Sequence, residues 1–345
     1  MDRQPNMRDV AEMLGVSVST VSRALKRDPR ITVETRDRVL EAAKQCGYRP
    51  NPMVSSLMAT RKGRQRGEIG TLALITDYRG VSSWKDKDVC RWTYSGMVER
   101  ANQLGYHITE FDLADYDYDS ARLEETLLNR GIRGVLLGFS RASGEALRLT
   151  EGQFSVVGVS NYFDHLPADR VTFYGYYNVR LALQKLSLLG FRKCGLVVPA
   201  LNNHLANNSW TAAYLDWQQS LEPAKRIEPY LPLAGQEGDL EPFKQWYERS
   251  QPEVVVVYKA PVKRLLEQMS LTVPDDVGLV YLYRERSEMD NTAGIDGRMD
   301  LVGGAAVDLI VEKLQRNLIE STENVKEIFI RGSWVDGPSL KTPAG

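Results

Sequence analysis

The chain has 345 residues and a formal net charge of −1, so it is long enough for a small head and a two-lobed body, and its overall charge identifies no partner. Its three cysteines, Cys46, Cys90 and Cys194, are far apart and odd in number, which excludes a disulfide framework and a zinc-binding spacing. No apolar run is long enough to span a bilayer and no signal peptide is present, so we expect a cytoplasmic protein.

The charge is divided unevenly along the chain. Residues 1–66 contain 14 lysines and arginines and 7 aspartates and glutamates, a net charge of +7, whereas the remainder has a net charge of −8. A basic head on an acidic body is typical of a nucleic-acid-binding protein whose body does not adhere to DNA.

The stretch MRDVAEMLGVSVSTVSRAL, residues 7–25, predicts two short helices joined by a tight turn. Asn6 can cap the first helix, with Asp9 in the reciprocal capping position. Gly15 supplies the turn and Ser17 can cap the second helix. Residues at helical spacing would bury one face: Val10, Ala11, Leu14, Val21, Ala24 and Leu25. This is the pattern of a helix-turn-helix, whose second helix enters the DNA major groove.

A third helix is predicted after the capping residue Thr32, over ITVETRDRVLEAAKQCGYRPN, and it would end at Gly47. Its buried stripe would be Val39, Ala42, Ala43 and Cys46. Asn51 and Pro52 then open the short apolar segment MVSSLMAT.

The ordered series DVAEMLGVSVSTVSRAL, TRDRVLEAAKQCGYRPN and a leucine-containing hinge closely resembles the DNA-binding headpiece of the lactose/galactose-repressor (LacI/GalR) family. The resemblance covers about the first sixty residues without a gap. It implies a sequence-specific transcriptional regulator, a repressor, that binds a palindromic operator as a homodimer.

Within the second helix, Arg23 is the best candidate base reader, because a guanidinium can bond two acceptors on one guanine edge. The resemblance implies that Val18 and Ser19 help to select the operator, and because both are small the half-site should differ from that of members with large polar residues there. For the basic residues past the end of this helix, contact with DNA phosphates and exposure to solvent are equally favoured interpretations. The expected DNA-binding residues are Met7, Ser17, Val18, Ser19, Thr20, Ser22, Arg23, Lys26, Arg30, Asn51, Leu57 and Met58.

The segment from Pro52 to Thr60 makes about two helical turns, which are too short to be stable alone in water. The resemblance implies that it folds when two copies pair on the operator, and that Leu57, with Met58 beside it, pries open a base step in the minor groove. Ser55 departs from the basic residue that many relatives carry near this wedge.

From Ile69 onward, continuous apolar strands alternate with amphipathic helices, which predicts parallel sheets covered on both faces. This part resembles the effector-binding core of the same family, itself similar to periplasmic sugar-binding proteins. The predicted fold is therefore an all-α helix-turn-helix headpiece followed by an α/β two-lobed body. The expected limits are 1–48 for the headpiece, 49–66 for the hinge and linker, and 67–345 for the body, with lobes of about 67–162 plus 295–320 and 163–294 plus 321–340.

Ligand sites in open parallel sheets lie at the carboxyl ends of strands. That rule nominates an effector cleft formed by Tyr78, Arg79, Ser160, Asn161, Tyr258, Lys259, Tyr283 and Arg284. The helix that opens at Trp210 adds an aromatic side chain at its first turn. Polar residues that hold sugar hydroxyls in relatives are largely missing here. Two interpretations stay open: a sugar stacked on the aromatic rings, with Asn161 and Arg284 as hydrogen-bonding partners, or a different ligand, such as an acid, or none.

No catalytic, phosphate-binding or metal-binding motif is present, so we expect no enzyme activity and no cofactor. The acidic run FDLADYDYD is interpreted as a solvated loop between a strand and a helix. The loop that contains Trp84 and Trp92 would cover the cleft or line a dimer interface. An alternative function is a cytoplasmic solute-binding protein with an inactive DNA-binding head.

Overall fold

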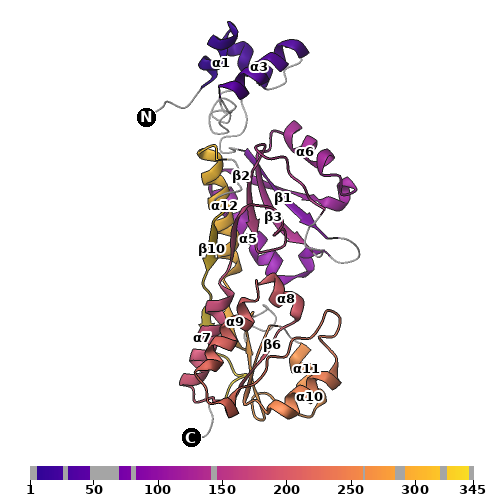
Figure 1. The fold of residues 1–345 in the computed structure, drawn as a ribbon, viewed down its shortest axis with the longest axis vertical. Helices are drawn as coiled ribbons and strands as arrows, with labels where there is room; N and C mark the ends of the chain where they lie inside the picture. Colours follow the sequence, from indigo (N-terminus) through magenta and orange to yellow (C-terminus); the bar gives the residue numbers. More distant parts are fainter. Residues whose placement is uncertain are drawn as a thin grey trace. The chain divides into compact units, whose positions relative to one another are not determined.

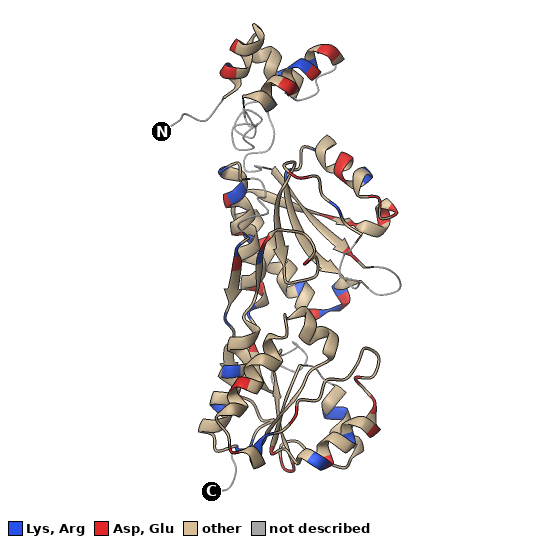
Figure 2. Ribbon diagram, viewed as in Figure 1, with Lys and Arg blue, Asp and Glu red and all other residues tan. Residues whose placement is uncertain are grey.

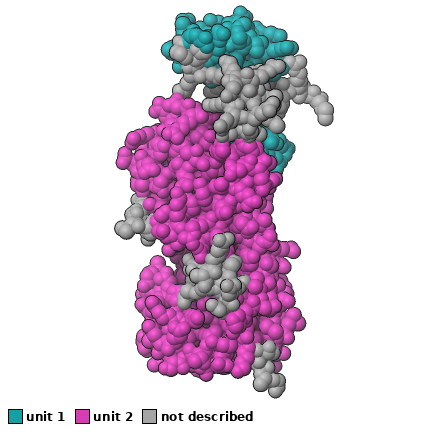
Figure 3. Space-filling view, turned by 180° about the vertical axis from the view of Figure 1, so that it is seen from behind, with its two compact units in different colours: residues 1–70, 311–318 teal, residues 71–310, 319–345 magenta. Residues whose placement is uncertain are grey.

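The computed structural model describes residues 6–25, 30–46, 70–78, 83–140, 146–258, 261–283, 292–318 and 325–341. The chain divides into two compact units, residues 1–70 with 311–318 and residues 71–310 with 319–345 (Figure 3). The three helices of the first unit are called the headpiece below, and the second unit is called the body.

The headpiece consists of α1 (Met7–Leu14), α2 (Val18–Leu25) and α3 (Val33–Gln45) (Figure 1). The predicted capping box at α1 is present: the Arg8 N–H donates to Asn6 Oδ1 at 2.8 Å and the Asn6 N–H donates to Asp9 Oδ2 at 2.6 Å. Gly15 ends α1 with φ 65°, the left-handed conformation that glycine adopts without strain. These local signals fix the angle at which α2 leaves α1.

The headpiece core is made of the small residues that the sequence predicts. Its buried side chains are Val10, Ala11, Val21, Ala24, Val39, Ala42 and Ala43. Leu14, Leu25 and Cys46, which were also predicted to be buried, are half-buried and pack against this core. Because the buried residues are small, the three helices can approach one another closely.

The first lobe of the body contains a six-stranded sheet with the order β10-β5-β4-β3-β1-β2. The pairs β10–β5, β5–β4, β4–β3 and β3–β1 are parallel. The strand bounds are β1 Gly70–Asp77, β2 Tyr106–Asp112, β3 Gly134–Ser140, β4 Ser155–Val159, β5 Asp169–Phe173 and β10 Glu327–Ile330.

The second lobe contains a five-stranded sheet with the order β11-β9-β8-β7-β6, in which only β11 pairs antiparallel among the described strands. The bounds are β6 Cys194–Val197, β7 Val254–Val257, β8 Gly278–Tyr281, β9 Ala293–Asp296 and β11 Ser333–Val335. Two parallel-sheet lobes confirm the predicted fold class.

The sheet order corrects the predicted lobe limits. The sequence assigned residues 163–294 and 321–340 to the second lobe, but β5 and β10 complete the sheet of the first lobe. The reason is local: β4 leads to β5 through turns and not through a helix, so no strand–helix alternation marks β5 in the sequence. Strands β9, β10 and β11 were not predicted either.

Helices cover the two sheets. The helices are α5 Asp88–Gln103, α6 Ser120–Asn129, α7 Gly175–Leu188, α8 Ala200–Leu205, α9 Ser209–Gln219, α10 Leu240–Ser250, α11 Pro261–Gln268 and α12 Met299–Gln315, with short 3₁₀ turns at Trp84–Asp86, Leu113–Tyr116 and Pro223–Lys225. No helix among the described residues is long and apolar enough to cross a membrane.

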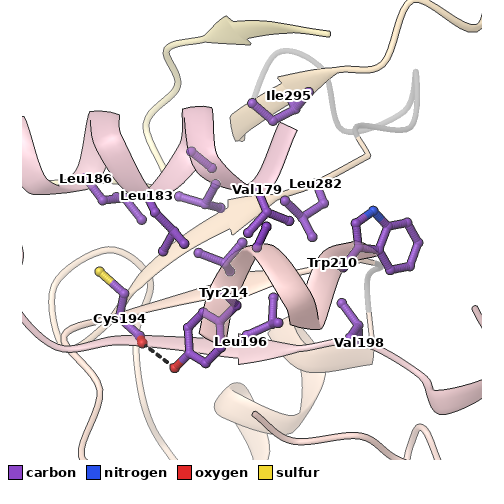
Figure 4. Packing of buried hydrophobic residues seen from close by; sticks show 14 of the residues in the cluster. Val179, Leu183, Leu186, Cys194, Leu196, Val198, Trp210, Tyr214, Leu282 and Ile295 are labelled. Atoms are coloured by element: carbon purple, nitrogen blue, oxygen red, sulfur yellow. Dashed lines mark hydrogen bonds between the residues drawn. The ribbon is translucent and has the colours of Figure 1, made fainter. Parts of the chain in front are cut away.

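Strand β7 shows why an uninterrupted apolar run is needed in the second lobe. Val254 and Val256 join one core cluster with α7 and α9, whereas Val255 and Val257 join another with α10 and α11. Figure 4 shows the first cluster, in which the Tyr214 hydroxyl donates to the Cys194 carbonyl oxygen at 2.8 Å. Both faces of the sheet are therefore buried, as the sequence predicts.

Candidate functional site

The exposed surface of α2 is the first candidate site. Ser17, Val18, Ser19 and Arg23 are exposed, while Val21 and Ala24 on the opposite side are fully buried. The Ser17 hydroxyl accepts the Thr20 N–H at 3.1 Å, which confirms it as the cap of α2. The helix is thus anchored by its inner residues and presents short polar side chains and one guanidinium outward.

Other predicted DNA-binding residues differ in their surroundings. Thr20 and Ser22 are half-buried at the edges of the exposed surface, and Arg30 is exposed before α3. Met7 is half-buried and packs against the headpiece core. Lys26, Asn51, Leu57 and Met58 lie outside the described residues.

The described headpiece helices carry charges of both signs (Figure 2). Eight of the 14 basic residues in the region 1–66 lie outside the described residues: Arg3, Lys26, Arg27, Arg49, Arg61, Lys62, Arg64 and Arg66. The excess positive charge is therefore concentrated in the segments that flank the helices, as expected for contacts to phosphates rather than to bases.

The carboxyl ends of the first-lobe strands are the second candidate site. Asp77 at the end of β1 is buried, and the Ser140 hydroxyl lies 3.4 Å from its Oδ2 atom. The Asp112 carboxylate accepts both the Thr76 hydroxyl at 2.8 Å and the Tyr78 N–H at 3.2 Å. These hydrogen bonds fix the end of β1 and hence the position of Tyr78.

Residues after β4 connect the two lobes. Ser160 has φ 60°, an uncommon left-handed conformation for serine, and it turns the chain at the end of the strand. The next residue, Asn161, donates from Nδ2 to the carbonyl oxygen of Leu205 on α8 at 2.9 Å. Asn161 therefore links the strand ends of the first lobe to a helix of the second lobe.

Aromatic rings from both lobes pack against one another near the strand ends. The Trp210 ring lies 4.9 Å from that of Tyr258 and 5.7 Å from that of Phe173, measured between centroids. Across the lobes, the rings of Trp92 on α5 and Tyr283 after β8 are 6.1 Å apart. Trp92 thus lies beside Tyr283, one of the residues predicted for the cleft, whereas Trp84 is buried against Tyr94 and Phe139.

Tyr162 follows β4 and is half-buried. Burial raises the pKa of its hydroxyl well above the ordinary value, and Cys90, Tyr258 and Tyr78 raise that pKa further. Tyr78 follows β1 and Tyr258 follows β7, and the cleft candidates that the structure describes are mainly aromatic. The basic candidates Arg79, Lys259 and Arg284 lie outside the described residues.

Comparisons with known proteins bear first on the headpiece. Residues 6–51 match the family described as "Bacterial regulatory proteins, lacI family". This range begins at the Asn6 cap and contains all three headpiece helices. The headpiece is that of the LacI family of bacterial regulatory proteins.

Longer alignments include the body of this LacI-family chain. The HTH-type transcriptional regulator AglR of Rhizobium meliloti is 31% identical over 145 residues, which make up 42% of this chain but only 38% of AglR. The ribose operon repressor of Haemophilus influenzae is 22% identical over 284 residues, 79% of this chain and 80% of that protein.

A solved structure, the lac repressor dimer bound to operator and the anti-inducer ONPF, has a TM-score of 0.58 at 18% identity. The match covers 98% of this chain and 100% of that one, so it shows the fold of the LacI-family chain along nearly its whole length. Regulators of this family are not enzymes.

Proposed function

We propose that this LacI-family chain is a dimeric repressor that reads a near-palindromic operator with α2 and is controlled by a small molecule bound between the lobes of its body. The observation that carries this proposal is the arrangement of α2, whose buried residues anchor it while Ser17, Val18, Ser19 and Arg23 face outward. A recognition helix needs one face that is anchored in the core and one face that is open to DNA.

Arg23 is assigned to base reading, because its exposed guanidinium can bond the O6 and N7 acceptors of one guanine. Ser17, Thr20 and Ser22 are assigned to phosphates, and Val18 and Ser19 to the choice of half-site. These roles make the operator of this chain different from those read by members with long polar residues at the two positions.

The dimer and the hinge are part of the same proposal. A lac repressor with the same fold is a dimer on its operator, and a two-fold symmetric reader requires two headpieces. Asn51, Leu57 and Met58 are assigned to the hinge contacts on sequence resemblance, with residues 1–48 as headpiece, 49–66 as hinge and the remainder as body. The protein would act in the cytoplasm, where operators are found.

The effector is proposed to bind among Tyr78, Asn161, Trp210, Tyr258 and Tyr283, with Arg79, Lys259 and Arg284 contributing if the ligand is acidic. The ring pair of Trp92 and Tyr283 supports this, because a ligand that separates or bridges these two rings changes the arrangement of the lobes. Only a difference in affinity for two lobe arrangements can transmit such a signal. A sugar and an acidic metabolite both fit these residues.

Selection of bound sequences from a random DNA duplex library, at two salt concentrations, tests the proposal. We expect a palindromic site with a central pyrimidine–purine step and a steep loss of affinity at the higher salt. Enrichment of no sequence at either salt, with full-length protein that is folded by circular dichroism, would favour the alternative function of a solute-binding protein with an inactive head.

A further inference from the structure

Strand β10 lies at an edge of the first-lobe sheet and exposes apolar side chains there. It stands first in the order β10-β5-β4-β3-β1-β2, and β5 is its one partner among the described strands. Figure 1 shows it at the side of the lobe away from α6. Ile328 is 36% exposed and Phe329 is 46% exposed. An exposed apolar edge is a template for pairing with another strand.

The pairing with β5 determines which backbone groups of β10 are left for a partner. The Tyr174 N–H donates to the Ile330 carbonyl oxygen at 2.8 Å, so the backbone groups of Ile330 face β5. Backbone direction alternates along a strand. The residues whose N–H and C=O groups face away from the sheet are therefore Glu327, Phe329 and Arg331. These backbone groups have no partner in the part of the chain that the structure describes.

The segment EIFIR, which begins at Glu327, is symmetric about Phe329 except for the sign of its terminal charges. When two copies of β10 lie antiparallel with Phe329 opposite Phe329, Glu327 of each copy lies opposite Arg331 of the other. These three pairs use the backbone groups that face outward, and Ile328 lies opposite Ile330 on the other face of the sheet. A slip of the centre to Glu327 or to Arg331 would place like charges opposite each other, which is destabilising. One register is therefore favoured.

Both ends of this segment carry an exposed charge. Glu327 pairs with Arg170 in the sheet, but the Arg170 guanidinium donates to the carbonyl oxygens of Phe163 and Leu166, at 2.7 and 2.9 Å. Neither Glu327 nor Arg331 forms an ion pair with any described residue. Each is therefore available to the opposite charge of a second copy.

Aromatic rings beside β10 continue its apolar surface. The Phe329 ring lies 5.1 Å from the Tyr174 ring, and the Tyr174 ring lies 5.9 Å from the Tyr177 ring, measured between centroids. The Arg331 guanidinium lies 4.8 Å from the centre of the Tyr177 ring. Because both tyrosines are half-buried, a second copy would pack its own Phe329 against rings that are already ordered.

The other described edges of the two sheets offer less to a partner. The edge of β6 is occupied, because the Tyr230 N–H donates to the Leu196 carbonyl oxygen at 2.8 Å and the Tyr230 carbonyl oxygen accepts the Val198 N–H at 3.1 Å. Strand β2 carries Glu110, which is ion-paired with Lys85 at 2.9 Å, and β11 has only 3 residues. Of the edges that the structure describes, β10 is therefore the best suited to strand pairing.

We propose that β10 is an interface between the bodies of two copies of this chain. The two β10 strands pair antiparallel about Phe329 and join the first-lobe sheets of the copies into one sheet. Two ion pairs between Glu327 and Arg331 fix the register. This pairing needs no DNA, so the inference goes beyond operator reading: the protein is a dimer before it meets its operator.

Sedimentation equilibrium of the full-length protein without DNA tests this proposal. We expect a dimer at a chain concentration of about 10 μM. Phe329→Asp should convert it to a monomer, because the central pair then brings two carboxylates together, and the melting temperature should change little, since Phe329 is exposed. Leu188→Asp on α7, at a position 82% exposed, is the matched control and should leave the dimer intact.

Exchange of the two charges tests the register. Glu327→Arg places two arginine pairs in the dimer and Arg331→Glu places two glutamate pairs, so each variant should dimerise at least about ten-fold more weakly. In an equimolar mixture, a chain of one variant pairs with a chain of the other, and both contacts again join opposite charges. The mixture should therefore form heterodimers with a Kd within about three-fold of the wild-type value, which native mass spectrometry identifies. A variant that merely misfolds is not rescued by mixing.

Three results would overturn the proposal: the protein without DNA is a monomer at about 100 μM, the dimer survives Phe329→Asp, or the mixture of the two charge variants dimerises no better than either variant alone. None of these results bears on operator reading, because a dimer held through another surface would still select a palindromic site from the duplex library. Failure of that selection, in turn, would leave a β10-paired dimer unaffected.

Discussion

Among the described residues, the buried core of the headpiece consists of valine and alanine, whereas each face of the second-lobe sheet buries aromatic and large aliphatic side chains. Trp210 and Tyr214 fill one face, and Phe243 and Trp246 fill the other. At about 25 cal/mol per Å² of apolar surface, the small residues contribute much less stabilisation per helix than the large ones.

Because of this difference, we expect the two regions to tolerate core substitutions to different extents. A helical unit of this size has a stability of only a few kcal/mol, at about 0.05–0.15 kcal/mol per residue. One unfavourable substitution in its core can therefore unfold the headpiece. The body, with two sheets and several core clusters, has more buried surface to lose.

The largest effect is expected for Val21→Asp, which places a carboxylate in the headpiece core, where Val21 is 0% exposed. The cost of about 3 kcal/mol or more would exceed the stability of the unit, so operator binding should fall at least about 100-fold. Fluorescence anisotropy with labelled operator measures this, and the main calorimetric transition should be unchanged.

Leu40→Asp is the matched control, because Leu40 on α3 is 46% exposed. It should leave most of the affinity in place. If Val21→Asp lowered the melting temperature of the body as well, the stabilities of the two regions would be coupled, contrary to the comparison.

Leu183→Ala is the corresponding core substitution in the body. Leu183 on α7 is fully buried, and truncation of a buried leucine costs about 2–5 kcal/mol. We expect the melting temperature of the body to fall by about 5–15 °C, with unchanged operator affinity at a temperature where the protein stays folded. Leu188→Ala, at a position 82% exposed on the same helix, should have almost no effect. Equal losses in the two variants would contradict the assigned core.

The sequence predicted the headpiece almost residue by residue, because its signals are local. Asn6, Gly15 and Ser17 act within four residues of their position, and each has the predicted role. Seven strands of the body were found for a similar reason, since an apolar run between turn residues is visible without knowledge of its partners.

Strands β5 and β10 were missed because their pairing is not local. Glu327 pairs with Arg170 in the sheet, although the two residues are far apart in the sequence. The apolar residues Ile328 and Phe329 of β10 are exposed, so this strand has no buried apolar face. The cleft residues were found only through the rule that ligands bind at strand ends.

Arg23→Ala should have a smaller effect than the core substitutions, and one confined to recognition. Loss of a bidentate base contact costs about 1–3 kcal/mol and relaxes preference at a single base pair of each half-site. Arg38→Ala on α3 removes the same charge from another exposed position and should weaken all sequences alike. Uniform weakening by Arg23→Ala across a set of operator variants would show that Arg23 does not read a base.

The smallest effect concerns the thiols, which report burial in each region. Cys46 in the headpiece is half-buried, whereas Cys90 and Cys194 in the body are buried. Burial raises the pKa of Cys194 to about 12, with a further rise from Glu253 and a lowering by Arg192. Mass spectrometry after iodoacetamide treatment should therefore find Cys46 modified first and Cys194 unmodified in the folded protein, even at pH 10.

The same pKa shift fixes the sign of a stability effect. In the unfolded chain the Cys194 thiol loses its proton near its ordinary pKa of about 8.5, while in the folded protein it keeps the proton up to about pH 12. The unfolded state then binds fewer protons, so this residue's contribution makes the free energy of unfolding fall as the pH rises across that interval. Cys194→Ala should flatten the alkaline part of the stability curve, and an unchanged slope, or modification of Cys194 as fast as Cys46, would show that the second-lobe core opens as readily as the headpiece.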